Sequence, residues 1–338
     1  MSLIRNMAGL VVTARRLGPC HLVVPAAEAD TSLGATIEAV QAGLVHATLV
    51  GDRAGLLRRI EKLGGKPSDY EIIDQADDVA AARAAVERVR AGKADLILKG
   101  RLKTGDLMRA VLDKETGLRA GQLLSDVMVA EDPFLGGRLI GITDGGLNVA
   151  PSLQQKKSII ENAVHTFRRL GVSRPKVACL CAIEVVQDSM PHTLDARALT
   201  EMNLKGEIAD CDVFGPLALD NALSLEAAKA KGVDHPVAGR ADILLMPTIE
   251  AGNALGKALT FFAKCVVGHV VNGARAPVLI PSRVESARDK LCSIAIGALS
   301  VHADRAGAAW PTPEMQRATA DLTDESVKKA MTELHIPW

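Results

Sequence analysis

The sequence predicts an α/β protein with two domains, in which mostly parallel sheets carry helices on both faces. Short apolar runs rich in β-branched residues alternate with alanine-rich helical patterns along nearly the whole chain. Such alternation is typical of βαβ units. The 338 residues, 48% of them hydrophobic, suffice for more than one core, and one hairpin signal interrupts the alternation.

The expected strands are short apolar runs whose length and β-branched content favour strand over helix. They lie at residues 21–26, 46–51, 70–74, 94–100, 176–183, 211–216, 241–247, 266–271 and 276–281. Helices are expected at residues 30–43, 76–92, 151–170, 221–231, 253–264 and 284–302. The polar tail after residue 302 is expected to pack on the surface with a short helix of its own.

The stretch from residue 123 to 146 breaks the alternation. It contains two strand-like runs joined by the sequence DPFLGG, which predicts a hairpin and therefore an antiparallel pair. A helix is expected to follow near Pro151. We place a domain boundary here, so that residues 1–148 plus about 286–338 form the first domain and 149–285 the second.

The composition excludes several classes of protein. Lys+Arg and Asp+Glu both number 40, no long basic block occurs and aromatic residues make up 2%, so no nucleic-acid partner is expected. The six cysteines form no Cys-x-x-Cys pair and the eight histidines no ligand spacing, so no metal is expected. With no leader-like N-terminus and no apolar run of membrane-spanning length, we expect a soluble cytoplasmic protein without a membrane partner.

The segment ILLMPTIEAGNALGKALTFF, residues 243–262, is similar to a P-loop motif. However, only three residues separate Gly252 from Gly256, and Ala258 follows Lys257 where a P-loop has Ser or Thr. The nucleotide interpretation therefore fails. A strand that leads through Glu250, Gly252 and Asn253 into a helix N-terminus still predicts an anion site.

The segment PVLIPSRVESARDK follows a buried-looking strand with Ser282, Arg283 and Asp289. Ser282 with Glu285 also fits a capping box, which would make Ser282 a helix cap and Arg283 a solvated side chain. Ser282 and Asp289 are seven positions apart, or roughly 10 Å if both are helical. They can act on one small group only if the first of these residues bend out of the helix.

Further candidates follow the strand ends, because ligands of parallel α/β sheets bind outside the carboxyl ends of strands. Residues 94–121 carry positively charged side chains that could bind phosphate. A run of such side chains more commonly forms the solvent-exposed face of a helix. Those cations are Lys99, Arg101, Lys103, Arg109 and Arg119. The polar residues that follow strands elsewhere are Thr104, Thr143, Asp144, Asn148, Glu184, Asp220 and Asn221, several of which also suit helix capping.

Four motifs in order resemble the phosphate acetyl/butyryltransferase family. They are LILKGRLKTGDLMRAVL, GPLALDNALS, ADILLMPTIEAGNALGKALTFFA and PVLIPSRVESARDK, and the resemblance runs from about Cys20 to Val301. It implies two three-layer αβα domains related to isocitrate and isopropylmalate dehydrogenases, with the active site in an interdomain cleft. It also implies a homodimer that uses acyl-CoA and inorganic phosphate, with coenzyme A as a substrate and no bound cofactor.

The resemblance also implies roles for individual residues. Ser282 and Arg283 match the pair beside the reacting thiol and phosphate, Asp289 the proposed general base and Arg109 a coenzyme A ligand. Substrate-binding motif positions are further occupied by Lys99, Thr104, Glu250, Gly252 and Asn253.

The amino-acid sequences of GPLALDNALS and EAGNALGKALTFFA are closer to the butyryl branch than to the acetyl branch of the family. Val284 and Glu285 follow the Ser-Arg pair where the acetyl branch has Gly-Cys. We therefore expect a phosphate butyryltransferase. The alternatives are a phosphate acetyltransferase, possibly the catalytic part of an enoyl-CoA hydratase fusion, a metal-dependent dehydrogenase on the same architecture, and a non-catalytic binder of coenzyme A or anions.

Overall fold

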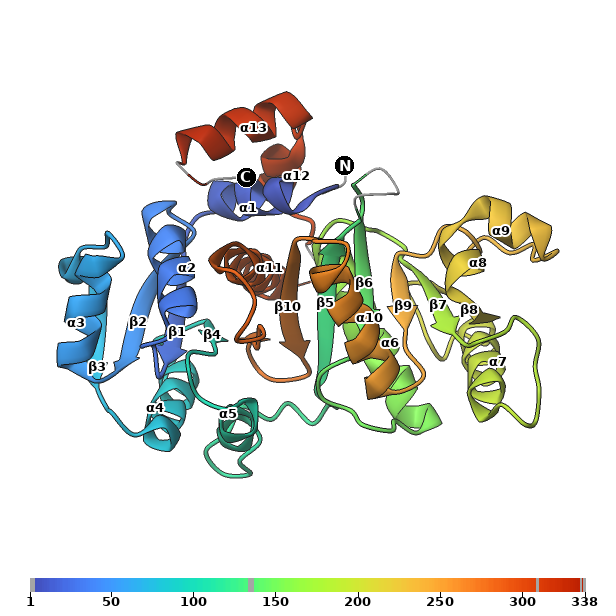
Figure 1. Ribbon diagram of the computed structural model, residues 1–338, viewed down its shortest axis with the longest axis horizontal. Coiled ribbons are helices and arrows are strands. Elements are labelled where there is room, and N and C mark those ends of the chain that lie inside the picture. The colour runs from blue at the N-terminus through green and yellow to red at the C-terminus, as the bar shows by residue number, and fades with distance from the viewer. Residues whose placement is uncertain (1–3, 133–136, 308–309, 335, 337–338) are drawn as a thin grey trace. The chain divides into compact units, whose positions relative to one another are not determined.

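The computed structural model describes residues 4–132, 137–307, 310–334 and 336 (Figure 1). The chain divides into two compact units. Unit 1 comprises residues 1–122 and 266–338, and unit 2 comprises residues 123–265. Among the described residues, no helix is both long and apolar enough to cross a membrane.

Unit 1 is built on a mostly parallel sheet in the order β3-β2-β1-β4-β11-β10. The first four strands pair in parallel, β11 joins β4 in parallel and β10 pairs with β11 antiparallel. The strands are β1 (Cys20–Pro25), β2 (Val45–Gly51), β3 (Tyr70–Asp74), β4 (Leu96–Leu98), β10 (Val267–Asn272) and β11 (Val278–Leu279). Thus strands from both ends of the chain share one sheet.

The helices of unit 1 fall into groups that pack on one another. One group joins α11 to α1 and α2 and places α11 on β10, and another joins α4 to α5. The helices are α1 (Met7–Leu17), α2 (Asp30–Gln41), α3 (Arg53–Lys62), the 3₁₀ turn η1 (Pro67–Asp69), α4 (Asp78–Arg90), α5 (Thr104–Val111), α11 (Ala287–Ala306), α12 (Pro313–Thr319) and α13 (Asp324–Glu333). Every residue of α11 from 290 to 301 is buried, so this helix is the centre of the core.

Unit 2 contains strands in the order β5-β6-β9-β7-β8. β5 and β6 pair antiparallel and the other neighbours pair in parallel. The strands are β5 (Ser125–Glu131), β6 (Leu139–Thr143), β7 (Lys176–Leu180), β8 (Asp212–Leu217) and β9 (Ile243–Leu245). The helices are α6 (Leu153–Arg169), α7 (Pro191–Leu204), α8 (Leu219–Leu223), α9 (Leu225–Ala230) and α10 (Ile249–Phe261).

All the expected strands are present, and the predicted antiparallel pair is β5 with β6. Residues 133–136 of its DPFLGG connection lie outside the described residues. The unit boundaries differ from the domain boundaries expected near residues 148 and 285. Long-range pairing explains the difference, because β6 pairs with β9 of unit 2, whereas β11 pairs with β4 of unit 1.

Three expected helices differ in detail. The helix expected over residues 221–231 is interrupted at Ser224, which ends α8 and caps α9 by accepting a hydrogen bond from the Ala227 amide at 3.2 Å. The helix expected from residue 253 begins at Ile249, and the one expected from residue 284 begins at Ala287. The tail forms two helices, α12 and α13, where one was expected.

Candidate active site

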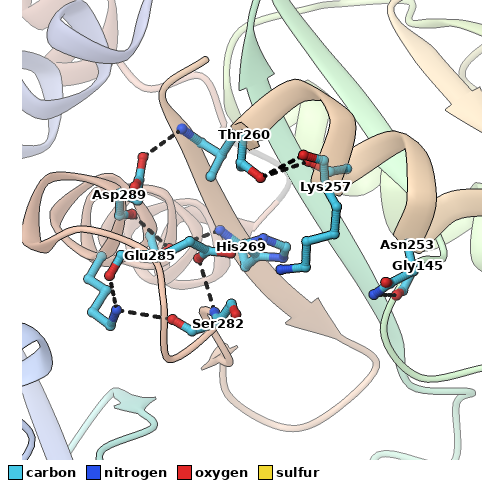
Figure 2. A network of polar contacts seen from close by, with 12 residues as sticks. Gly145, Asn253, Lys257, Thr260, His269, Ser282, Glu285 and Asp289 are labelled. Carbon is cyan, nitrogen blue, oxygen red and sulfur yellow. Dashed lines mark hydrogen bonds and ion pairs between the residues drawn. The ribbon is translucent and has the colours of Figure 1, made fainter. Parts of the chain in front are cut away.

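The segment between β11 and α11 carries Ser282 and Arg283, and the first turn of α11 carries Asp289. Ser282 and Asp289 are labelled in Figure 2. The capping box of α11 is made by Ser286, whose Oγ accepts from the Asp289 amide at 3.2 Å, and by Asp289, whose Oδ2 accepts from the Ser286 amide at 3.0 Å. The capping box expected at Ser282 and Glu285 is therefore wrong, because the N-cap of α11 is Ser286, four residues after Ser282. Ser282 lies outside the helix, as a shared site with Asp289 would require.

Ser282 and Arg283 have side chains that contact no polar partner in the part of the chain that the structure describes. Among the described residues, the Ser282 hydroxyl makes no hydrogen bond, and the exposed Arg283 guanidinium makes neither a hydrogen bond nor an ion pair. A hydroxyl can donate or accept, and a guanidinium offers five N–H donors in a planar fork. The segment therefore presents donors suited to the oxygens of phosphate or of a carbonyl group.

Asp289 has its carboxylate largely engaged within unit 1. Oδ2 accepts from the Ser286 hydroxyl at 2.6 Å as well as from the Ser286 amide, whereas Oδ1 accepts from the Val267 amide of β10 at 3.1 Å. Each carboxylate oxygen offers two acceptor positions, so one position remains on Oδ1. Asp289 thus joins α11 to β10 and could take up a proton only at Oδ1.

Lys99 directly follows the apolar strand β4, and its side chain is buried, with the residue 4% exposed. Its ammonium has no hydrogen bond or ion pair among the described residues. Burial is the main cause that lowers the pKa of Lys99 from 10.5 to about 8, and the charges of Arg283 and Lys290 lower it further, opposed by Glu285. An unpaired buried cation beside two others is an arrangement that an anion would stabilise.

The other predicted residues of unit 1 lie on or near α5. Thr104 is the first residue of α5, after the N-cap residue Lys103. The Arg109 side chain is 74% exposed and pairs with Asp106 at 2.9 Å. No hydrogen bond or ion pair among the described residues joins Arg109 to the segment after β11. Its exposed guanidinium nevertheless keeps donors available for a ligand.

The EAGN residues of unit 2 lie within the first turns of α10, and the expectation of a turn there is wrong. Thr248 caps the helix, and the exposed Glu250 carboxylate has its pKa lowered by a hydrogen bond from the Thr248 hydroxyl. A Cβ at Gly252 would lie 2.7 Å from Asp144 O, so only glycine permits this close approach. Asn253 Nδ2 donates to Gly145 O at 3.2 Å (Figure 2).

The polar residues after β6 form a closed turn. The Asp144 carboxylate accepts from the amides of Gly146 at 2.7 Å and Leu147 at 2.9 Å and from Asn148 Nδ2 at 2.6 Å. Burial and the nearby Asp126 raise the pKa of Asp144, and the hydrogen bonds oppose this rise. These bonds account for Asp144 and Asn148 as turn residues.

The remaining strand-end candidates are also engaged in polar contacts. Asp220 lies 3.1 Å from Lys231, and Asn221 Nδ2 donates to Glu184 at 3.3 Å. Arg101 pairs with Glu28 at 3.3 Å and with Asp78 at 2.8 Å. Within the described parts of the chain, no group of three or more His, Cys, Asp or Glu side chains could hold a metal ion.

Comparison with known proteins decides the family. The sequence model of the phosphate acetyl/butaryl transferase family matches residues 79–298, which is more than half of the chain. The chain belongs to this family. It is therefore a member of an enzyme family of phosphate acyltransferases, which use coenzyme A as a substrate.

Curated relatives include members with either acyl specificity. The chain is 40% identical over 297 residues to a phosphate butyryltransferase from Clostridium acetobutylicum, covering 88% of this chain and 98% of the relative. It is 43% identical over 290 residues to a phosphate acetyltransferase from Thermotoga maritima, covering 86% and 98%. These identities show the family and leave the choice between butyryl and acetyl open.

Among solved structures, the chain is similar to a branched-chain phosphotransacylase from Enterococcus faecalis V583. The TM-score is 0.72 and the identity 30%, and the match covers 83% of this chain and 99% of that chain. A phosphotransacetylase from Streptococcus pyogenes matches with a TM-score of 0.70 at 22% identity, covering 84% and 94%, which shows a shared fold. The α/β fold expected from the sequence is confirmed at this level.

In this phosphate acyltransferase, three further polar residues surround the Ser-Arg pair: Glu285, for which the sequence predicts only a capping role, and Lys290 and His269, which no sequence motif indicates. Lys290 Nζ donates to Ser282 O at 3.1 Å and to Glu285 O at 2.5 Å, and His269 Nε2 lies 3.5 Å from Glu285 Oε1. An available signal was the position of Lys290 in a strongly apolar helix, where a charge usually has a partner.

Proposed function

We propose that the protein reversibly transfers a short-chain acyl group between coenzyme A and inorganic phosphate, and that it prefers butyryl to acetyl. The main supporting observation is that, within the described parts of the chain, the side chains of Ser282 and Arg283 have no protein partner and share unit 1 with Lys99, which is buried and has no partner there either. The proposed preference for butyryl rests on the sequences of the motifs, which are closer to the butyryl branch. It also rests on Val284-Glu285, which follows Arg283 where the acetyl branch has Gly-Cys.

Arg283 and Lys99 are the proposed ligands of phosphate and of the acyl phosphate. Electrostatics within unit 1 support this assignment, because burial and then the Arg283 charge lower the pKa of Lys99. A phosphate anion near both cations would relieve their repulsion and replace the missing partner of Lys99. Arg283 could also stabilise the oxyanion that forms on the acyl carbonyl, without losing its own charge.

Asp289 is the proposed general base. In the direction of acyl-CoA synthesis, Oδ1 takes the proton of the coenzyme A thiol, and the sulfur attacks the carbonyl carbon of the acyl phosphate. The bond from the acyl carbon to the phosphate oxygen then breaks, and phosphate leaves as an anion. A thiol with a pKa near 8.5 is mostly protonated at neutral pH, so a base would raise the fraction of thiolate. Ser282 is proposed to donate a hydrogen bond to the thiolate or to a phosphate oxygen.

Six residues are proposed to bind coenzyme A or phosphate: Lys99, Thr104, Arg109, Glu250, Gly252 and Asn253. The exposure of Arg109 suits contact with a coenzyme A phosphate group. For Gly252 and Asn253, the contacts with Asp144 and Gly145 suggest that they act by positioning the start of α10. The expected cleft and homodimer remain predictions.

An acyl-chain series tests the proposed function. Release of coenzyme A from acetyl-, propionyl-, butyryl- and valeryl-CoA would be followed with and without phosphate. We expect phosphate-dependent release, with kcat/KM at least about 10-fold higher for butyryl-CoA than for acetyl-CoA, since each methylene in an apolar pocket can contribute that much discrimination.

The outcomes separate the alternatives. A maximum at acetyl-CoA would contradict the butyryl preference and support a phosphate acetyltransferase. Absence of phosphate-dependent release with every substrate, together with a thermal shift on adding coenzyme A, would indicate a non-catalytic binder.

A further inference from the structure

The segment from Ser282 to Glu285 forms a turn closed by its own last residue, and we call these four residues the Ser-Arg turn. The Glu285 amide donates to Ser282 O at 3.2 Å, and the Ser282 amide donates to Glu285 Oε2 at 3.0 Å. Residues 282 and 285 therefore exchange two hydrogen bonds, one of which depends on the Glu285 side chain (Figure 2).

A buried lysine holds both ends of the same turn. Lys290 lies on α11 and is 2% exposed. Its ammonium donates to the carbonyl oxygens of Ser282 and Glu285, which are the first and last residues of the turn. Ammonium–carbonyl hydrogen bonds are charge-assisted and stronger than neutral ones, so they tie the turn to the helix.

Glu285 also ties the turn to the sheet. It is 6% exposed, and its Oε1 lies 3.5 Å from Nε2 of His269 on β10. The His269 amide in turn donates to Ser293 Oγ of α11 at 2.9 Å. The turn is thus held from β10 through Glu285 and from α11 through Lys290.

This arrangement is costly if its purpose is only to connect a strand to a helix. Removing a carboxylate and an ammonium from water costs free energy that many connections avoid by using neutral side chains. Meanwhile the Ser282 and Arg283 side chains make no hydrogen bond or ion pair with any described residue. The buried charges therefore serve to orient the two side chains that remain available.

We propose that Glu285 and Lys290 are positioning residues, which hold the Ser-Arg turn in the conformation that lets Ser282 and Arg283 bind the reacting groups. Neither residue needs to touch the substrate. The kinetic consequence rests on the proposed function, whereas the rigidity of the turn does not. A displacement of about 1 Å in a positioned group can reduce turnover about 100-fold.

The test compares Glu285→Ala, Glu285→Gln and Lys290→Met with the wild type. Glu325→Ala and Lys329→Met, at exposed positions of α13, are matched controls.

Amide hydrogen exchange of residues 280–286 is measured first. We expect Glu285→Ala and Lys290→Met to lose protection in the turn, while α11 stays protected. Glu285→Gln should keep protection, because its amide oxygen can still accept from the Ser282 amide. Unchanged protection of the turn, or equal loss along α11, would overturn the proposal.

Turnover of butyryl-CoA with phosphate is the second measurement. We expect kcat to fall about 100-fold in Glu285→Ala and Lys290→Met and only a few-fold in Glu285→Gln. On an Arg283→Ala background, Glu285→Ala should cause little further loss, because both changes disable the same group. Independent, multiplying losses would refute the positioning role. If the wild type has no activity, the proposed function fails, and hydrogen exchange still decides whether these residues hold the turn.

Discussion

Lys99→Met should stabilise the protein while abolishing its ability to bind phosphate. The folded protein holds the Lys99 ammonium in a buried position, where its pKa falls from 10.5 to about 8. The folded state therefore disfavours the charged form. The resulting destabilisation is complete below about pH 8, declines as the pH rises towards 10.5, and vanishes above it.

The pKa change sets the magnitude of the effect. A lowering from 10.5 to about 8 corresponds to about 3 kcal/mol at pH 7 and about 1 kcal/mol at pH 10. Methionine has a similar length and no charge, so Lys99→Met should raise the free energy of unfolding by up to these amounts. Urea unfolding at both pH values measures the change, with Lys93→Met, at an exposed position before β4, as the control.

Phosphate should offset most of the stability difference between the two proteins at pH 7 and reverse their order of stability at pH 10. Phosphate at 100 times its Kd would stabilise the wild type by about 2.7 kcal/mol, and it should have little effect on Lys99→Met. If Lys99→Met is no more stable than the wild type at pH 7, or if its gain is the same at pH 7 and pH 10, the account of a buried unpaired ammonium is refuted. An equal response of both proteins to phosphate would remove Lys99 from the anion site.

Other substitutions test the remaining assignments. Arg283→Ala should lower kcat about 100- to 1,000-fold in the acyl-CoA assay with its denaturation midpoint unchanged, and near-normal turnover would exclude the proposed oxyanion role. Asp289→Asn should lower kcat about 100-fold or more and change the coenzyme A Kd little by calorimetry, whereas full turnover would show that Asp289 only caps α11. Gly252→Ala should destabilise unit 2 by about 1–3 kcal/mol in urea unfolding, because its Cβ would meet Asp144 O. Gly105→Ala, where a Cβ meets nothing within 4 Å, is the control and should cost no stability.

The sequence by itself determined the order and type of most elements. Apolar runs and helical periodicity are local properties, so each strand could be recognised without knowing its neighbours. The positions of Lys99 after β4 and of Ser282 and Arg283 after β11 were also visible, because polar residues following buried strands mark the carboxyl edge of a sheet.

The tertiary structure decided which strands share a sheet and which polar residues meet. Pairing of β11 with β4 joins segments about 180 residues apart and brings Arg283 into the electrostatic environment of Lys99. Asp289 closes the local capping box of α11 with Ser286, and it also accepts from the Val267 amide of β10, a contact that only the folded chain provides. Local patterns carry no information on such long-range contacts, and burial, which lowers the pKa of Lys99, exists only in the folded chain.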